Sequence, residues 1–230
     1  MQTKGGFMMV KDPITTCNEE LSNANVEDVM QAIVRLEKAM NLEKLRFEDP
    51  ANASEYDKDV TPVERIDWYR KYLQQARKIA IEKGAELEVS EELQKVIDFN
   101  HDIDEIDMIM YQRGTIQDHV VIRASYDRGV LTIDRVHKVD GDDKEASSKE
   151  YKEELKDVVD QFKELYLGEW EDHYVLDEES EPIEEWNVTI SYKDGREEVL
   201  FEGADRYPYN FEEFASLMGD DSFKMHASKR

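Results

Sequence analysis

Cysteine and long apolar runs are the first things that this chain lacks. Its 230 residues include one cysteine, Cys17, so no disulfide can form within the chain. No apolar run approaches the ~18 residues that a membrane-spanning helix needs, and the short apolar stretch over 7–10 does not have the layout of a signal peptide. A lone cysteine fits a reducing compartment. We therefore expect a cytoplasmic protein without a membrane segment.

The motifs of the common enzyme classes are missing as well. There is no Walker loop, no glycine fingerprint of a dinucleotide-binding fold and no G-x-S-x-G elbow, and glycine accounts for only 10 residues. The histidines are scattered, and Cys17 has no catalytic signature around it. The sequence therefore assigns no catalytic residue, no cofactor and no specific metal ligand.

What the chain has in excess is negative charge. It carries 55 Asp and Glu against 30 Lys and Arg, a formal net charge of -25 at pH 7. A field of this sign repels nucleic acid and anionic membranes and attracts basic partners. Hydrophobic residues make up 40% of the chain and aromatic residues 10%, which is enough material for a folded core.

The first half of the chain has the apolar spacing of helices. Asn25 is a suitable N-cap for a helix over 26–40. Thr61 and Glu64 have the spacing of a capping box at the start of a second helix. Ser90 begins a third, shorter helix.

Near residue 105 the apolar period changes to two, as in strands. Alternation starts at Ile106, and the segments 120–126 and 130–136 form a predicted hairpin. A second hairpin is predicted from 186–192 and 199–201, around an Asp-Gly turn. Hairpins with a long helix between them predict the α+β class: a helical N-terminal part, then an antiparallel sheet of hairpins packed on a long helix.

Between the two hairpins the sequence predicts an acidic loop over 140–145 and a long helix over 148–167. At about 100° per residue, the apolar side chains of this helix fall on one face and its carboxylates on the opposite face. Steps of three or four residues put successive carboxylates ~5–6 Å apart, close to the spacing of phosphates along a nucleic-acid strand. The stripe consists of Glu150, Glu153, Glu154, Asp157, Asp160 and Glu164.

Negative charge continues beyond this helix, because residues 169–185 hold nine acidic side chains and no Lys or Arg. The members that we assign to partner binding are Glu169, Glu171, Asp172, Asp177, Glu178 and Glu179. Like charges gathered in this way oppose compact folding. The stripe and this segment therefore favour a non-enzymatic interaction protein that binds a basic protein surface. Its sharper form is a nucleic-acid-mimicking inhibitor of phage or mobile-element origin. The alternative is a surface that only keeps the protein soluble.

A packed tryptophan, a hairpin with an Asp-Gly turn and a Gly/Pro exit into a helix follow one another in the C-terminal half. The residues of this pattern are Trp170, Tyr174, the run from Trp186 to Gly195, Gly203, Pro208, Phe211 and Phe214. The pattern resembles the C-terminal module of small uncharacterised bacterial and phage proteins, over about residues 105–218. The resemblance implies a fold and carries over no functional residue.

The segment Asp102–Asp107 offers an alternative function. Asp102 and Asp104 have the spacing of the first two ligands of a calcium-binding loop. Ile106 and Asp107 stand where such a loop needs a further ligand and a glycine. A divalent-metal-dependent enzyme that uses this cluster is kept as the second hypothesis.

A third hypothesis is a structural or assembly module, with a homodimer as one form. The second predicted helix carries six Lys and Arg interleaved with three aromatic residues, which can bind single-stranded nucleic acid. In so acidic a chain we expect this stretch to dock instead on the chain's own carboxylates or on a second copy. The expected organisation is a flexible N-terminus over 1–24, a helical region over 25–100, an α+β domain over 101–218 and a frayed tail over 219–230.

Overall fold

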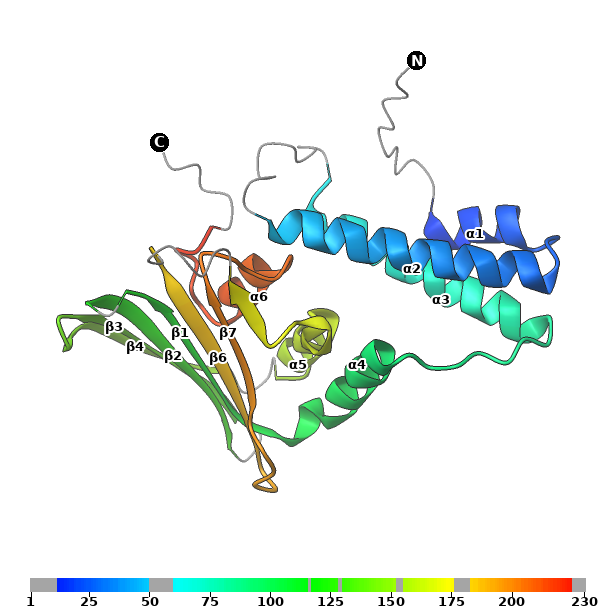
Figure 1. Ribbon diagram of the computed structural model, residues 1–230. Helices are drawn as coiled ribbons and strands as arrows, with labels where there is room; N and C mark the ends of the chain where they lie inside the picture. The colour runs from blue at the N-terminus through cyan, green and yellow to red at the C-terminus, as the bar shows by residue number, and fades with distance from the viewer. Residues whose placement is uncertain are drawn as a thin grey trace, which may run out of the picture. The chain divides into compact units, whose positions relative to one another are not determined.

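The computed structural model describes residues 12–49, 60–115, 117–127, 130–151, 155–175 and 183–224. In these ranges the chain forms six α-helices and a seven-stranded mixed sheet (Figure 1), which confirms the predicted α+β class. The chain divides into two compact units. One comprises 12–47 and 60–88, and the other comprises 48–49 and everything described from Val89 onward. The third predicted helix therefore belongs to the sheet unit.

The helical unit contains α1 (Pro13–Leu21), α2 (Val26–Glu48) and α3 (Pro62–Glu82). The predicted capping box at the start of α3 is present. The backbone N–H of Glu64 donates to Thr61 Oγ1 (3.1 Å), and the N–H of Thr61 donates to Glu64 Oε2 (2.8 Å). Asn25 Oδ1 accepts a hydrogen bond from the N–H of Asp28 (2.9 Å) at the start of α2. Local capping therefore sets where both long helices begin.

Helix α1 lies in the stretch that we expected to be a flexible N-terminus. The Asp12 carboxylate caps it by accepting a hydrogen bond from the N–H of Thr15 (2.8 Å). Cys17 and Leu21 on this helix are buried in an apolar cluster with residues of α2 and α3, such as Ile33. Burial of this small face holds α1 in place. Residues 1–11 lie outside the described part of the chain.

The sheet has the strand order β4-β3-β2-β1-β6-β7-β5. Its strands are β1 (Ile106–Gly114), β2 (Asp118–Asp127), β3 (Val130–Val139), β4 (Asp142–Tyr151), β5 (His173–Val175), β6 (Glu185–Tyr192) and β7 (Val199–Ala204). All neighbouring pairs are antiparallel except β5 with β7, which is parallel. Both predicted hairpins are confirmed, and the predicted all-antiparallel sheet is corrected only at this short edge strand.

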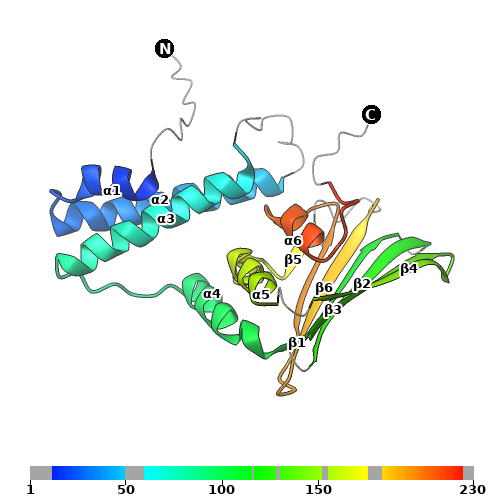
Figure 2. The ribbon, with the colours of Figure 1, turned by 180° about the vertical axis from the view of Figure 1, so that it is seen from behind.

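Three helices, α4 (Glu91–Asp102), α5 (Leu155–Glu164) and α6 (Phe211–Leu217), lie on one side of the sheet (Figure 2). The short 3-10 turns η2 (Ile103–Glu105) and η3 (Leu167–Glu169) flank α4 and α5. Their apolar side chains, among them Phe99, Phe162 and Phe211, share one core with alternate residues of the strands. In β6 the buried positions follow the predicted period of two, from Trp186 to Tyr192. The sheet unit therefore has one covered face.

Strand β4 replaces the predicted acidic loop and the first turn of the predicted long helix. Asp140 and Gly141 both have positive φ (51° and 85°) and form a two-residue turn that closes the hairpin of β3 and β4. An Asp-Gly turn of this kind is a hairpin signal. The strand itself is exposed along 142–150, so it has no apolar alternation for a sequence pattern to detect. Among the described residues, α5 begins at Leu155.

Candidate functional site

The negative charge is concentrated in one of the two units. Residues 89–230 hold 38 of the 55 acidic residues and 17 of the 30 basic ones, a formal charge of -21. Residues 1–88 hold the other 17 acidic and 13 basic residues, a formal charge of -4. A basic partner would therefore be attracted chiefly to the sheet unit.

Three residues of the predicted acidic stripe lie on helix α5. Asp160 and Glu164 are exposed and one helical turn apart, and Asp157 occupies the preceding turn. Lys163 is the neighbouring cation, and its Nζ lies 3.6 Å from Asp104 Oδ2. The core of the stripe is thus a helical pair of exposed carboxylates with one lysine that already has an acidic neighbour.

Glu150, which was also predicted for the stripe, is not on this helix. Glu150 lies on β4, where it is paired with Thr132 of β3, because the strand extends through Tyr151. Strand β4 is at the opposite edge of the sheet from β5, so Glu150 is separated from the acidic residues that precede β5. The predicted carboxylates outside the described residues are Glu153, Glu154, Asp177, Glu178 and Glu179.

The acidic residues between η3 and β5 have two different environments. Glu171 and Asp172 are exposed, whereas Glu169 is half-buried and its Oε2 accepts a hydrogen bond from the Tyr209 hydroxyl (3.2 Å). The backbone carbonyl of Asp172 accepts a hydrogen bond from the N–H of Glu202 (3.0 Å), which fixes this segment beside β7. Together with α5, the segment forms a run from 160 to 172 with five carboxylates and one lysine.

In the segment Asp102–Asp107, the alternative metal site, basic side chains of the chain itself lie beside the carboxylates. Asp102 pairs with the Arg196 guanidinium, and Asp104 has Lys163 beside its carboxylate. His101 projects into solvent, with 85% of its side chain exposed. Among the described residues, no three His, Cys, Asp or Glu side chains converge in a way that could hold a metal ion. The geometry therefore does not favour the metal-dependent enzyme.

The basic stretch of α3 also docks on groups of its own unit. Arg77 Nη2 lies 2.7 Å from Glu37 Oε1, and Arg65 Nη1 lies 3.6 Å from Glu43 Oε2, both carboxylates being on α2. Lys83 Nζ donates a hydrogen bond to the carbonyl oxygen of Ser22 (2.8 Å). These contacts agree with the expectation that this stretch serves the chain's own packing.

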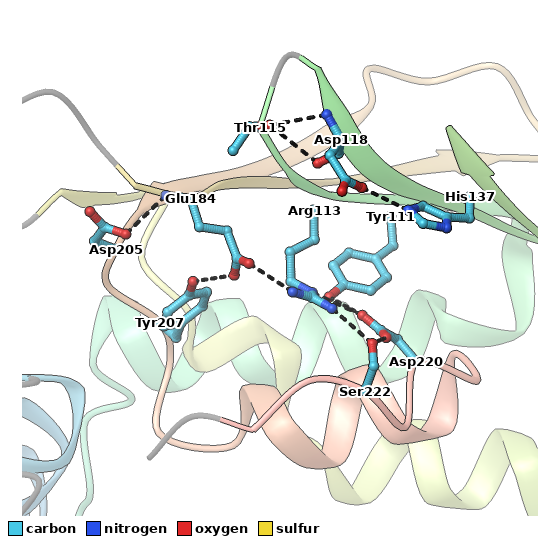
Figure 3. A network of polar contacts seen from close by, with 10 residues as sticks. All are labelled: Tyr111, Arg113, Thr115, Asp118, His137, Glu184, Asp205, Tyr207, Asp220 and Ser222. Atoms are coloured by element: carbon cyan, nitrogen blue, oxygen red, sulfur yellow. Dashed lines mark hydrogen bonds and ion pairs between the residues drawn. The ribbon is translucent and has the colours of Figure 1, made fainter. Parts of the chain in front are cut away.

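A polar network at one end of the sheet has no counterpart in the sequence predictions (Figure 3). Its centre is Arg113 of β1, whose Nε donates to Asp220 Oδ2 (2.9 Å) and whose Nη1 donates to Glu184 Oε2 (2.7 Å). The Tyr111 hydroxyl donates to the same Asp220 oxygen (3.1 Å), and the Tyr207 hydroxyl donates to Glu184 Oε1 (2.6 Å). The side chain of Asp220 is fully buried, and that of Arg113 is 14% exposed.

The network keeps its charged groups ionised despite burial. Desolvation opposes the charge of Asp220, but hydrogen bonds from Arg113 and Ser222 outweigh it and lower the pKa of Asp220 below its ordinary value. Burial raises the pKa of Tyr111, and the adjacent Asp220 charge raises it further. The hydroxyl of Tyr111 therefore stays protonated and donates. The Arg113 guanidinium of β1 bonds both to Glu184, just before β6, and to Asp220, after α6. These three residues therefore hold three segments of the chain together, and we call them the clamp.

The clamp also corrects the prediction for the C-terminal tail. We expected 219–230 to fray, but Asp220 and Phe223 are 1% and 4% exposed. The Arg113 guanidinium carbon lies 5.3 Å from the centre of the Phe223 ring. An ion pair and an aromatic contact order this segment without any periodic sequence pattern. Residues 225–230 lie outside the described part.

Comparison of the chain with protein-family models, with curated proteins and with solved structures finds no match. In the described part of the chain, no helix is long and apolar enough to cross a lipid bilayer.

Proposed function

We propose that the chain is an acidic, non-enzymatic interaction protein whose segment from 160 to 172 binds a basic surface of another protein. The observation that supports this function is the charge of that segment. Four of its carboxylates are exposed, and its one cation, Lys163, lies beside Asp104. The sheet unit as a whole has the same sign of field, because residues 89–230, this segment included, carry a formal charge of -21.

The kind of partner follows from the charge and its spacing. Asp160 and Glu164 are separated by roughly 6 Å along α5, which is comparable with the spacing of phosphates on a nucleic-acid strand. A protein groove that holds phosphates with Lys and Arg would accept such a surface. We therefore propose that the partner is a nucleic-acid-binding protein and that nucleic acid competes with this chain for it. Electrostatic steering would make association fast and sensitive to salt.

Charge reversal tests the segment directly. The triple variant Asp160→Lys, Glu164→Lys and Asp172→Lys changes exposed side chains and shifts the formal net charge from -25 to -19. Tagged wild-type and variant chains are incubated at low salt with a nuclease-treated lysate, and the captured proteins are eluted with salt and quantified. We expect the variant to lose the proteins that the wild type captures, and excess duplex DNA to displace them from the wild type.

A matched control separates the local surface from the overall charge. The variant Glu82→Lys, Glu86→Lys and Glu88→Lys has the same net charge, but its exposed changes are in the helical unit. It should retain the captured proteins. If both triple variants capture the same proteins as the wild type, the proposed binding segment is wrong. If both lose them equally, only the total charge matters.

A further inference from the structure

Strand β4 is a long edge strand, and in the described part of the chain no strand lies beside one of its two sides. It has ten residues, Asp142–Tyr151, and residues 142–150 are all exposed. Among the described strands it is bonded to β3 alone and ends the sheet (Figure 2). The opposite edge, β5, has only three residues. An exposed edge of this length is a template for pairing with another strand.

The sheet register determines which residues of β4 direct their backbone groups outward. The N–H of Thr115 donates to the carbonyl of Asp118 (2.8 Å), which makes these two residues a hydrogen-bonded pair between β1 and β2. Bonded residues alternate along antiparallel strands, so the register makes Arg135 and Ser147 a bonded pair between β3 and β4. In the regular part of β4, from Glu145 to Tyr151, the even-numbered residues, such as Ala146, consequently point their N–H and C=O groups away from the sheet.

The charge sequence of β4 is complementary to itself when it is read in the opposite direction. Around Ser147 the order is Lys144, Glu145, Ala146, Ser147, Ser148, Lys149 and Glu150. An antiparallel copy with its two-fold axis at Ser147 sets Lys144, the extra residue at the register shift between β3 and β4, opposite Glu150. It also sets Glu145 opposite Lys149, and each of these pairs occurs twice. The same register sets Ala146 opposite Ser148, whose backbone groups both point outward. Hydrogen-bond parity allows this alignment, and the charges favour it over the alignments beside it.

We propose that two copies of this chain associate through β4 in this register and join their sheets into one continuous antiparallel sheet. Neighbouring registers are less favourable. Moving the axis to Ala146 sets Asp142 against Glu150, a like-charged pair that offsets the opposite charges of Asp143 and Lys149. Moving it to Ser148 leaves the four charged residues Lys144, Glu145, Lys149 and Glu150 without an opposite charge across the axis. A second copy is thus favoured over a strand of arbitrary sequence, because the charged residues of β4 would find no opposite charges on such a strand.

The interface that this geometry allows is small. The register between β3 and β4 shifts at His137 and Lys138, so the regular part of β4 begins at Glu145. Each copy also carries a formal charge of -25, which opposes association at low ionic strength. We therefore expect a concentration-dependent dimer that is best observed near 0.15 M salt, where the Debye length is about 8 Å.

Charge exchange tests the register. Glu145→Lys sets two lysines opposite each other across the interface, and Lys149→Glu sets two glutamates opposite each other, so each single variant should weaken self-association roughly tenfold. The double variant restores opposite charges and should return to within about twofold of the wild type. Sedimentation velocity of the full chain measures the dissociation constants. Total charge alone predicts a different order, because Glu145→Lys changes the net charge from -25 to -23 and would then strengthen association.

Cysteine cross-linking tests the position of the two-fold axis. In the proposed register two copies of Ser147 form a non-bonded pair with Cα atoms about 4.5 Å apart, which is within disulfide range. Ser147→Cys should therefore form a covalent dimer under mild oxidation, whereas Ser148→Cys, displaced along the strand, should not. The native Cys17 does not interfere, because burial raises the pKa of its thiol to about 11. If the double charge variant fails to recover, or both cysteine variants cross-link equally slowly, the proposal is wrong and the edge is left for a strand of another protein.

Discussion

At the scale of the residue, Asp220 connects the C-terminal segment to the sheet through one carboxylate. It accepts hydrogen bonds from Arg113 and Tyr111 of β1, which are more than 100 positions earlier in the chain. The sequence could not reveal this contact, because neither periodicity nor a local motif links the two regions. Buried acidic and basic residues that balance each other leave no signature except their composition. The contact had to come from the three-dimensional arrangement.

Removal of this charge should destabilise the sheet unit. Asp220→Asn keeps the shape of the side chain but leaves the mostly buried Arg113 with Glu184 as its one remaining carboxylate partner in the network. Loss of one member of a buried ion pair costs about 3 kcal/mol of the free energy of unfolding. Urea denaturation at pH 7 measures the difference. The neighbouring exposed Asp221→Asn is the control and should stay within about 0.5 kcal/mol of the wild type.

The same variant also predicts a pH dependence. The pKa of Asp220 is lower in the folded chain than its ordinary value, so the unfolded state binds the proton more readily. The stability that this carboxylate contributes is present above the unfolded pKa, about 3.9, and is lost as the pH falls through the folded pKa. The gap between wild type and Asp220→Asn should therefore narrow below about pH 4. A gap that is constant, or that widens in acid, would contradict the ionised clamp.

At the scale of the element, the predictable parts are those with local signals. Thr61 and Glu64 mark the start of α3, and apolar residues at every second position mark β6. Both elements were therefore predicted from sequence. Strand β4 was missed because a strand exposed on both faces carries no apolar pattern, although its Asp140-Gly141 turn is a hairpin signal. The helix predicted over 148–167 included the end of β4 for a related reason. The charge pattern with the helical period continued by chance into that strand.

The position of β7 beside β6 depends on a glycine. Gly203 is paired with Trp186 in the sheet, and a Cβ atom built at Gly203 would lie 2.5 Å from the indole Nε1 of that tryptophan. The indole is buried and its Nε1 donates to the carbonyl of Arg206 (2.8 Å), so it cannot move aside freely. Gly203→Ala should cost about 3 kcal/mol through overpacking. This close approach is a physical reason for a glycine in the predicted Trp–hairpin–Gly pattern.

The control for this prediction is a glycine with space around it. Gly195 has φ +70°, and a Cβ built there meets nothing within 4 Å. Gly195→Ala should therefore cost only the strain of a left-handed backbone, about 1 kcal/mol. Chemical denaturation of both variants gives the comparison. Gly203 does not have a positive φ, so a loss at 203 no larger than that of Gly195→Ala would mean that contact with Trp186 does not determine the requirement for glycine there.

At the scale of the whole molecule, the two units differ in charge as well as in structure. The composition predicted an acidic protein with a folded core, and the two units show that most of the excess belongs to the sheet unit. The candidate binding segment was predicted in part. Asp160, Glu164, Glu171 and Asp172 are exposed as expected, whereas Glu150 belongs to the distant edge strand. Sequence gives the amount of charge, but the fold decides which carboxylates become neighbours.

This uneven charge predicts that salt stabilises the two units unequally. Repulsion among carboxylates opposes the compact state, and screening relieves it as the Debye length falls from about 30 Å at 0.01 M to about 8 Å at 0.15 M salt. Residues 89–230 carry a formal charge of -21 and residues 1–88 carry -4. Amide hydrogen exchange measured at the two salt concentrations should therefore slow more in peptides from 89–224 than in peptides from 12–47 and 60–88.

Sodium chloride and potassium chloride should act alike at equal ionic strength, because screening does not depend on the identity of the cation. Equal protection of the two units would show that the excess carboxylates are too widely spread to repel one another, and the attraction of the sheet unit for a basic partner would lose its physical basis.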